Sequence, residues 1–179
     1  MKAQGVDVIN MSVGEPDFMP PEPIKEAGKK AIDDNFSKYS PVPGYPALRN
    51  AISKKLKVEN GLDYAASEII VGTGGKQGVC NAIMALVNPG DEVIIPAPYW
   101  VSYPQMVKLA GGNPVIISAG IEQDFKITAD QLEASITPKT KMIILCSPSN
   151  PTGSVYTKAE LDELAKVVIS HEDVFVLSD

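Results

Sequence analysis

Ser147-Pro148-Ser149-Asn150-Pro151-Thr152-Gly153 directly follows the apolar run Lys141-Met142-Ile143-Ile144-Leu145-Cys146. A short apolar run that stops at two X-Pro bonds and a Gly is typical of a buried strand ending in a shaped loop. Ligands of open α/β sheets bind in the crevice beyond the carboxyl ends of the strands. The pattern therefore places Asn150, which carries both donor and acceptor groups, at a ligand-binding edge. Taken alone, the heptapeptide is also compatible with an ordinary Pro-rich turn.

Strand-like and helix-like segments alternate along the chain around this stretch. Apolar runs bounded by turn residues mark strands, whereas helical spacing of apolar residues and capping boxes mark helices. This alternation predicts a three-layer α/β/α fold whose mainly parallel sheet is covered by helices on both faces. The expected strands are 68–71, 91–96, 114–118, 142–146 and 174–177, and the expected helices are 76–87, 99–110 and those opened by Thr128 and Thr157.

The first 67 residues follow a different pattern. Helical segments at 22–34 and 46–60 flank a loop at 40–44 that is rich in Pro and Gly. We interpret this region as a lead-in that packs beside the sheet, and we place a domain boundary between residues 45 and 46.

Composition and charge exclude several classes of protein. The formal net charge of −6 argues against nucleic acid or an anionic membrane as the main partner. No apolar run reaches the roughly 18 residues of a membrane span, and the N-terminus lacks the apolar region of a signal peptide. Cys80 and Cys146 are the two cysteines, and His171 is the single histidine. This usage argues against a disulfide framework or a metal site and favours a cytoplasmic protein.

Four loops are expected to follow strand ends and to share one rim of the sheet. The Gly-rich loop 72–76 opens a helix, so its amides could hold a phosphate, although it matches no nucleotide motif and could be a plain turn. Trp100 could stack on a flat ring or fill the core. Asp179 could pair with a ring nitrogen or cap a helix. Together with Asn150, these residues describe a site for a phosphorylated aromatic heterocycle.

These motifs resemble those of the fold-type I pyridoxal-phosphate aminotransferases, and within them the bacterial aspartate aminotransferase subgroup of class I. The resemblance implies that residues 1–45 belong to a small domain and the edge of the active site, and that residues 46–179 begin the large, cofactor-binding domain. It runs over essentially the whole chain and includes Gly14-Glu15-Pro16-Asp17, Lys38-Tyr39 to Gly44, Gly74 to Gln77, Pro98 to Tyr103, Ser147 to Gly153 and Val176 to Asp179.

The resemblance implies cofactor contacts for residues on all four loops. The amides of Gly74-Gly75-Lys76 would bind the phosphate of pyridoxal 5'-phosphate, and Trp100 would stack on its ring. Asn150 would hydrogen-bond the phenolic oxygen, and Asp179 would pair with the pyridinium nitrogen. A protonated ring is the electron sink for a carbanion at the substrate Cα.

The resemblance also implies substrate and subunit contacts. Gly14 and Asn150 would bind the substrate α-carboxylate, Trp100 would border the substrate, and Lys76 would help to recognise a distal carboxylate. Lys76 could also be a solvated lysine at a helix start. Tyr39 would reach the cofactor phosphate of a partner subunit, which implies a homodimer with shared active sites. The family further implies cis peptide bonds at Ala97-Pro98 and Asn150-Pro151.

No lysine of this chain fits the role of the family's Schiff-base lysine, which lies beyond the position equivalent to Asp179. We therefore expect no catalytic residue in the chain, an incomplete large domain and no activity from the 179 residues alone. The predicted enzyme moves an amino group between aspartate or glutamate and a 2-oxo acid. The alternatives are an aminotransferase for aromatic or prephenate-like substrates, a related pyridoxal-phosphate lyase, and a non-catalytic fragment of the fold.

Overall fold

The computed structural model describes residues 4–9, 14 and 16–179. Their contacts divide the chain into two units, Met1–Tyr45 and Pro46–Asp179, and each is described by itself. The first unit contains helix α1 (Glu22–Asp33), which begins with a proline in its first turn and carries a basic residue in its last. This helix confirms the one expected at 22–34.

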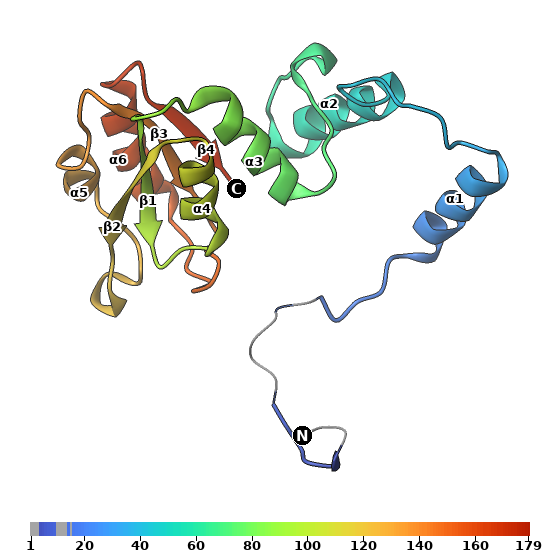
Figure 1. Ribbon diagram of the computed structural model, residues 1–179, viewed down its shortest axis with the longest axis horizontal. Coiled ribbons are helices and arrows are strands. Elements are labelled where there is room, and N and C mark those ends of the chain that lie inside the picture. The colour runs from blue at the N-terminus through green and yellow to red at the C-terminus, as the bar shows by residue number, and fades with distance from the viewer. Residues whose placement is uncertain (1–3, 10–13, 15) are drawn as a thin grey trace. The chain divides into compact units, whose positions relative to one another are not determined.

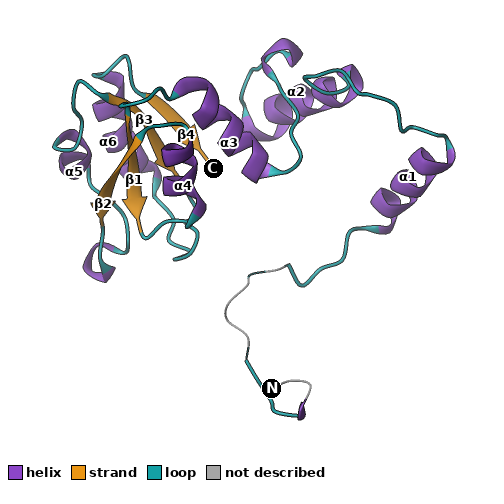
Figure 2. Cartoon of the chain, in the orientation of Figure 1, coloured by secondary structure: helices purple, strands orange, loops and turns teal. Residues whose placement is uncertain are grey.

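The second unit is built on a parallel sheet, as the alternating pattern predicted, but the sheet has four described strands where five were expected. The strands are β1 (Glu92–Ala97), β2 (Asn113–Ser118), β3 (Thr140–Leu145) and β4 (Phe175–Ser178). They lie in the order β2-β1-β3-β4 (Figure 1). Because consecutive parallel strands need crossover connections, helices follow them on the faces of the sheet (Figure 2).

Each face of the sheet carries its own apolar core. Ile95 of β1 packs in one cluster with residues of α3 (Gly75–Leu86) and α4 (Ser102–Leu109). The adjacent Ile94 packs in the other cluster, with residues of α5 (Ala129–Glu133) and α6 (Lys158–Ile169). Side chains alternate along a strand, so a strand covered on both faces is apolar at every position. The three-layer prediction is therefore confirmed.

Two further helical elements precede the sheet in the second unit. Helix α2 (Pro46–Asn60) lies beside the short 3₁₀ helix η2 (Ala66–Glu68). The Nε–H of Arg49 donates to the carbonyl of Ile69 at 2.9 Å, and the hydroxyl of Ser53 donates to the carbonyl of Tyr64 at 2.6 Å. Among the described residues, no helix has the length and apolar character needed to cross a membrane.

The prediction of a strand at 68–71 is wrong. Ile69 has extended dihedral angles, with φ −111° and ψ 128°, but no described strand pairs with this segment. The side chain of Ile70 is 76% exposed. A β-branched run becomes a strand only when a neighbour accepts its backbone hydrogen bonds, and the sequence of the run does not reveal that neighbour. The helix expected at 99–110 also begins later, at Ser102.

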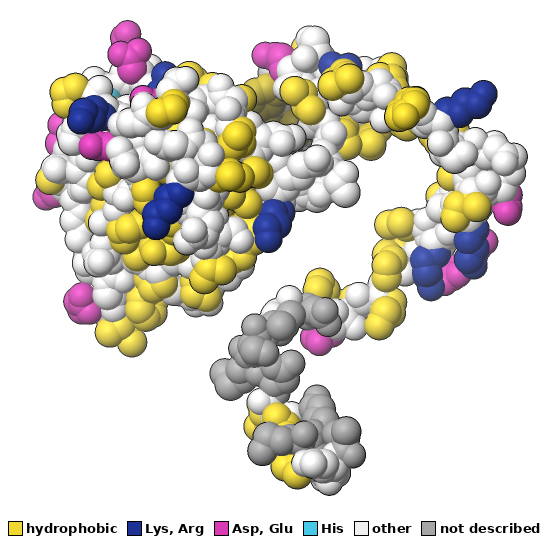
Figure 3. All heavy atoms as spheres, viewed as in Figure 1, with side chains coloured by type: hydrophobic (Ala, Val, Ile, Leu, Met, Phe, Trp, Pro, Cys, Tyr) yellow, Lys and Arg dark blue, Asp and Glu magenta, His cyan; other side chains and the backbone are white. Residues whose placement is uncertain are grey.

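Apolar side chains reach the surface of the second unit beside its last strand. Within the described residues, β4 pairs only with β3, and Phe175 and Val176 of β4 are 45% and 50% exposed. An apolar groove beside them is lined by Leu145, Leu161, Val168, Ile169 and Val176, among others. Figure 3 shows hydrophobic side chains at the surface on one face of the molecule. A soluble monomer rarely leaves a strand edge and an apolar groove side by side in this way.

Both capping boxes predicted from the sequence are present. The hydroxyl of Thr128 accepts the amide of Gln131, whose side chain accepts the amide of Thr128, at the start of α5. At the start of α6, the Thr157 amide donates to the Glu160 carboxylate at 2.6 Å, and the Glu160 amide donates to the Thr157 hydroxyl. Each box satisfies helix N–H groups that have no partner within the helix.

Glu160 gives a testable pH dependence. The hydrogen bond from Lys126, followed by those from Thr157, lowers the pKa of Glu160 to about 2. A pKa lowered by folding means that the charged carboxylate stabilises the fold above its ordinary pKa, and that this contribution disappears as the pH falls toward 2. We expect Glu160→Gln to lower the free energy of unfolding at pH 7. Near pH 2, the free energies of unfolding of the variant and the wild type should become similar.

Urea unfolding at pH 7 and at pH 3 would measure this difference. Glu163→Gln is the matched control, because Glu163 lies on the same helix in an exposed ion pair with Lys166. The control should have a small effect, since exposed pairs contribute little. An equal effect of Glu160→Gln at both pH values would contradict the prediction.

Candidate functional site

The carboxyl ends of β1, β3 and β4 lie at one edge of the sheet, because all the strands are parallel. The loops that follow them carry Trp100, Asn150 and Asp179. The Gly-rich loop at 72–76 differs from expectation, since no strand precedes it among the described residues. Helix α3 places it instead, and the Lys76 Nζ lies 5.1 Å from the centroid of the Trp100 ring. This approach brings the fourth loop to the same rim.

A cleft opens at this rim between the loops that follow β1 and β3. Its walls include the aromatic residues Tyr99, Tyr103, Phe125 and Tyr156, and Asn150 supplies an amide. An apolar, aromatic cleft with a few polar groups is the usual form of a small-molecule site. The cavity itself measures about 20 Å³, so it borders the rim and is too small to hold a ring.

Tyr103 contacts both the indole ring of Trp100 and the carboxylate of Asp179. Its ring packs edge-on against Trp100 with 5.4 Å between centroids, and its hydroxyl donates to Asp179 Oδ2. The Tyr103 side chain is 2% exposed. Burial, followed by the hydrogen bonds with Asp179 and Cys146, raises the pKa of Tyr103 well above its usual range. A neutral phenol therefore orients the Asp179 carboxylate.

Tyr103 was not among the predicted site residues. It lies three residues after Trp100, in the first turn of α4, and this short spacing was the available signal. Its partner Asp179 is 76 positions away, so the contact itself could not be read from the sequence. The amide of Asp179 continues the ladder of β4 by donating to the carbonyl of Leu145 at 3.0 Å.

The Gly-rich loop leaves open space at the N-terminus of α3. Gly74 has φ +81°, a left-handed value that favours Gly, and its carbonyl accepts the amides of Gln77 and Gly78. A Cβ at Gly74 or Gly75 would meet no atom within 4 Å. The Thr73 amide donates to the side-chain oxygen of Gln77, which ties the loop to the first turn of α3. Free helix amides and the positive end of a 12-residue helix face this space, and an anion is favoured there.

The Asn150 loop is fixed by hydrogen bonds inside it. The Ser149 amide donates to the carbonyl of Ser154 at 2.9 Å, and the Gly153 amide donates back to the carbonyl of Ser149 at 2.8 Å. The cis bonds predicted at Ala97-Pro98 and Asn150-Pro151 are present. Ser147-Pro148 is cis as well, which the sequence analysis did not predict.

Comparison with known proteins decides the class of this site. The family model described as "Aminotransferase class I and II" matches residues 6–179. The chain belongs to this aminotransferase family.

Curated relatives of this aminotransferase-family chain match it from end to end. The aspartate/prephenate aminotransferase of Cereibacter sphaeroides is 56% identical over 179 residues, which are 100% of this chain and 45% of the relative. The aspartate aminotransferase of Bacillus sp. is 51% identical, with the same two coverages. The chain thus spans somewhat less than half the length of the curated relatives it matches.

Solved structures of the family have the same fold over this region. The aspartate aminotransferase from Rhizobium meliloti superposes with a TM-score of 0.95 at 46% identity, covering 100% of this chain and 45% of that one. An aromatic aminotransferase from Pyrococcus horikoshii superposes with a TM-score of 0.91 at 41% identity, covering 99% and 48%. A structure named as an aspartate aminotransferase and one named as an aromatic aminotransferase therefore share the scaffold described above.

Two predicted site residues lie in the first unit, which is described by itself. Gly14 is exposed, and the side chain of Tyr39 is fully exposed. Glu15, which belongs to the same motif as Gly14, lies outside the described residues. The roles expected for Gly14 and Tyr39 stay predictions.

Proposed function

We propose that this chain is the cofactor-binding part of a pyridoxal-phosphate aminotransferase that moves an amino group between aspartate or glutamate and a 2-oxo acid. The observation that carries the proposal is the meeting at one rim of an open helix N-terminus, an aromatic plate, an amide and a carboxylate. Aspartate stands in the names of the Cereibacter sphaeroides and Bacillus relatives and of the Rhizobium meliloti structure.

The described residues fit pyridoxal 5'-phosphate in the charge and chemical type of their groups. The open space before Gly74 and Gly75 matches a phosphate, because free amides and the helix dipole favour an anion there. Trp100 supplies a face for the ring. The Asp179 carboxylate, oriented by Tyr103, suits a protonated ring nitrogen. The three groups complement the phosphate, the ring and the nitrogen of a single molecule.

In this proposal, the residues of the chain bind and orient the cofactor and the substrate. Asp179 holds a proton on the ring nitrogen, Asn150 hydrogen-bonds the phenolic oxygen and the substrate α-carboxylate, and Trp100 restricts the ring to one plane. When bound, pyridoxal phosphate supplies the electron sink for negative charge at the substrate Cα. We propose that the lysine which carries the cofactor in this family lies in the part of the relatives' length that this chain does not span.

We further propose a cytoplasmic homodimer that acts in amino-acid biosynthesis, with Tyr39 reaching the cofactor phosphate of the partner subunit. One observation favours a second class of 2-oxo acid as the acceptor of the amino group. The relatives named aspartate/prephenate aminotransferase make a prephenate-like 2-oxo acid the leading alternative.

Lys76 provides the test of the substrate class. Its ammonium lies over the Trp100 ring, where a distal carboxylate of the substrate would meet it. In the intact protein, Lys76→Ala should raise KM for aspartate about tenfold, since a hydrogen bond to a charged group contributes on the order of 1.5 kcal/mol or more. KM for an aromatic amino acid should stay nearly unchanged.

Steady-state kinetics with both amino donors would measure this contrast. Lys108→Ala is the matched control, because Lys108 is an exposed lysine in the last turn of α4. An equal loss with both donors would contradict the role of Lys76 in distal-carboxylate recognition. A wild-type protein that neither binds pyridoxal phosphate nor transaminates either donor would refute the proposed function itself.

A further inference from the structure

The segment from Ile121 to Ile127 forms part of the cleft although it belongs to none of the four rim loops. It begins with the 3₁₀ helix η3 (Ile121–Gln123) and continues through Asp124 and Phe125, whose φ values are 53° and 57°. These are left-handed values that residues other than Gly adopt only when the surroundings hold them. Phe125 lines the cleft together with Asn150. The position of this wall therefore depends on contacts that hold the segment.

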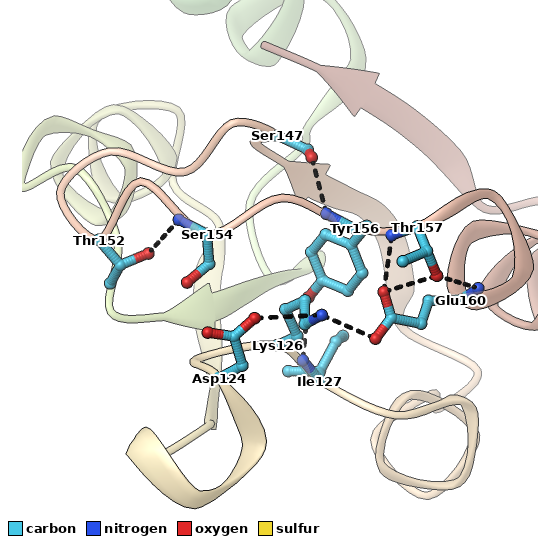
Figure 4. Close-up of polar contacts among 9 residues, drawn as sticks. All are labelled: Asp124, Lys126, Ile127, Ser147, Thr152, Ser154, Tyr156, Thr157 and Glu160. Atoms are coloured by element: carbon cyan, nitrogen blue, oxygen red, sulfur yellow. Dashed lines mark hydrogen bonds and ion pairs between the residues drawn. The ribbon is translucent and has the colours of Figure 1, made fainter.

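An ion-pair cluster attaches this segment to α6. The Lys126 Nζ lies 2.8 Å from Glu160 Oε1 and 3.2 Å from Asp124 Oδ2 (Figure 4). The Lys126 side chain is 14% exposed. Its partner Glu160 is held in turn by the capping box with Thr157. A largely covered ammonium with two carboxylate partners fixes the backbone on both sides of residue 126.

Tyr156 joins this segment to the Asn150 loop. Its buried phenolic oxygen accepts the amide of Ile127 at 2.9 Å, and its own amide donates to the hydroxyl of Ser147 at 3.2 Å. Figure 4 shows the Tyr156 ring lying between these two contacts. Ser147 starts the Asn150 loop, and the bond between Ser149 and Ser154 closes it. One residue therefore links two walls of the cleft that are far apart in the sequence.

We propose that Tyr156 is a positioning residue for Asn150 and Phe125, supported by the ion pair between Lys126 and Glu160. This inference rests on the proposed function, because Asn150 is there a ligand of the cofactor and the substrate. Without the phenolic oxygen, the buried amide of Ile127 loses its partner. The segment and the loop can then shift separately. A displacement of about 1 Å in a substrate-positioning group can cost on the order of a hundredfold in rate.

Tyr156→Phe in the full-length holoenzyme tests the proposal, because it removes only the oxygen that accepts the Ile127 amide. We expect KM for both substrates to rise about tenfold and kcat to fall less. The absorbance maximum of the bound cofactor should also shift, because Asn150 contacts its phenolic oxygen. A residue that only stabilises the fold would change the melting temperature without moving this maximum. Tyr64→Phe, at a half-exposed tyrosine of the same unit, is the matched control.

The outcomes separate this inference from the proposed function. A wild-type protein that binds no pyridoxal phosphate overturns both. A wild-type protein that binds cofactor and transaminates aspartate, with a Tyr156→Phe variant equal to it in KM and absorbance, overturns the positioning role alone. Should Tyr156→Phe fail to fold, Glu160→Gln provides the test, since it weakens the ion pair with Lys126 without altering Tyr156. Its KM and absorbance should then shift in the same direction by a smaller factor, and unchanged values overturn the proposal.

Discussion

Asp179→Asn in the intact protein is expected to lower turnover by about a hundredfold or more while the cofactor still binds. A carboxylate within a few ångströms of a basic nitrogen favours its protonated form by about one to three pKa units, and Asn removes that charge. Each unit changes the ratio of protonated to neutral ring about tenfold. The electron sink weakens accordingly, whereas the phosphate, ring and phenolic-oxygen contacts proposed for this chain remain.

The variant is also expected to fold normally. Asn keeps an oxygen that accepts the hydroxyl of Tyr103, and the backbone bond between residue 179 and Leu145 does not involve the side chain. Steady-state kinetics and titration with pyridoxal phosphate, followed by absorbance, would separate rate from binding. Asp173→Asn, in the exposed turn before β4, is the matched control and should behave as the wild type. Near-normal transamination by Asp179→Asn would remove Asp179 from the assigned role.

The strands of the sheet could be predicted because each is specified by its own residues. Each of β1 to β4 contains a continuous apolar run of at least three residues, as expected of a strand covered on both faces, and polar residues stand only at the strand ends. The two capping boxes could also be predicted, because each lies within four consecutive residues. The expected strand at 68–71 failed because its existence depends on a neighbouring strand, and the run itself carries no information about that neighbour.

The same distinction applies to the candidate site: features specified by neighbouring residues could be predicted, and contacts between distant residues could not. The rim loops with Trp100, Asn150 and Asp179 follow from parallel strands, whose carboxyl ends meet at one edge. The contacts that orient these residues join distant positions, such as the one between Tyr103 and Asp179. A tyrosine in an apolar stretch reads as a core residue, and only the three-dimensional arrangement shows what its hydroxyl contacts. Tyr156 was missed for the same reason, since its partner Ile127 lies 29 positions earlier.

Expressed alone, residues 1–179 are expected to self-associate and to be inactive. Within the described residues, one edge of β4 is unpaired, and the adjacent groove exposes Ile169 and Val176. Unpaired edges are templates for association, and apolar grooves promote it. Light scattering should report oligomers at micromolar concentration. Val176→Lys should reduce association by placing a charge at the edge, whereas Val58→Lys, on the exposed surface of α2, should not.

The same preparation tests whether any lysine of this chain carries the cofactor. We propose that the family's lysine lies outside this chain, so pyridoxal phosphate should be held only by the Gly-rich loop, Trp100, Asn150 and Asp179. Borohydride reduction followed by mass spectrometry should then find scattered, substoichiometric modification of exposed lysines. A monomer with one lysine modified stoichiometrically, together with measurable aspartate transamination, would show that the 179 residues form a complete active site, against the interpretation of this chain as the cofactor-binding part of a larger enzyme.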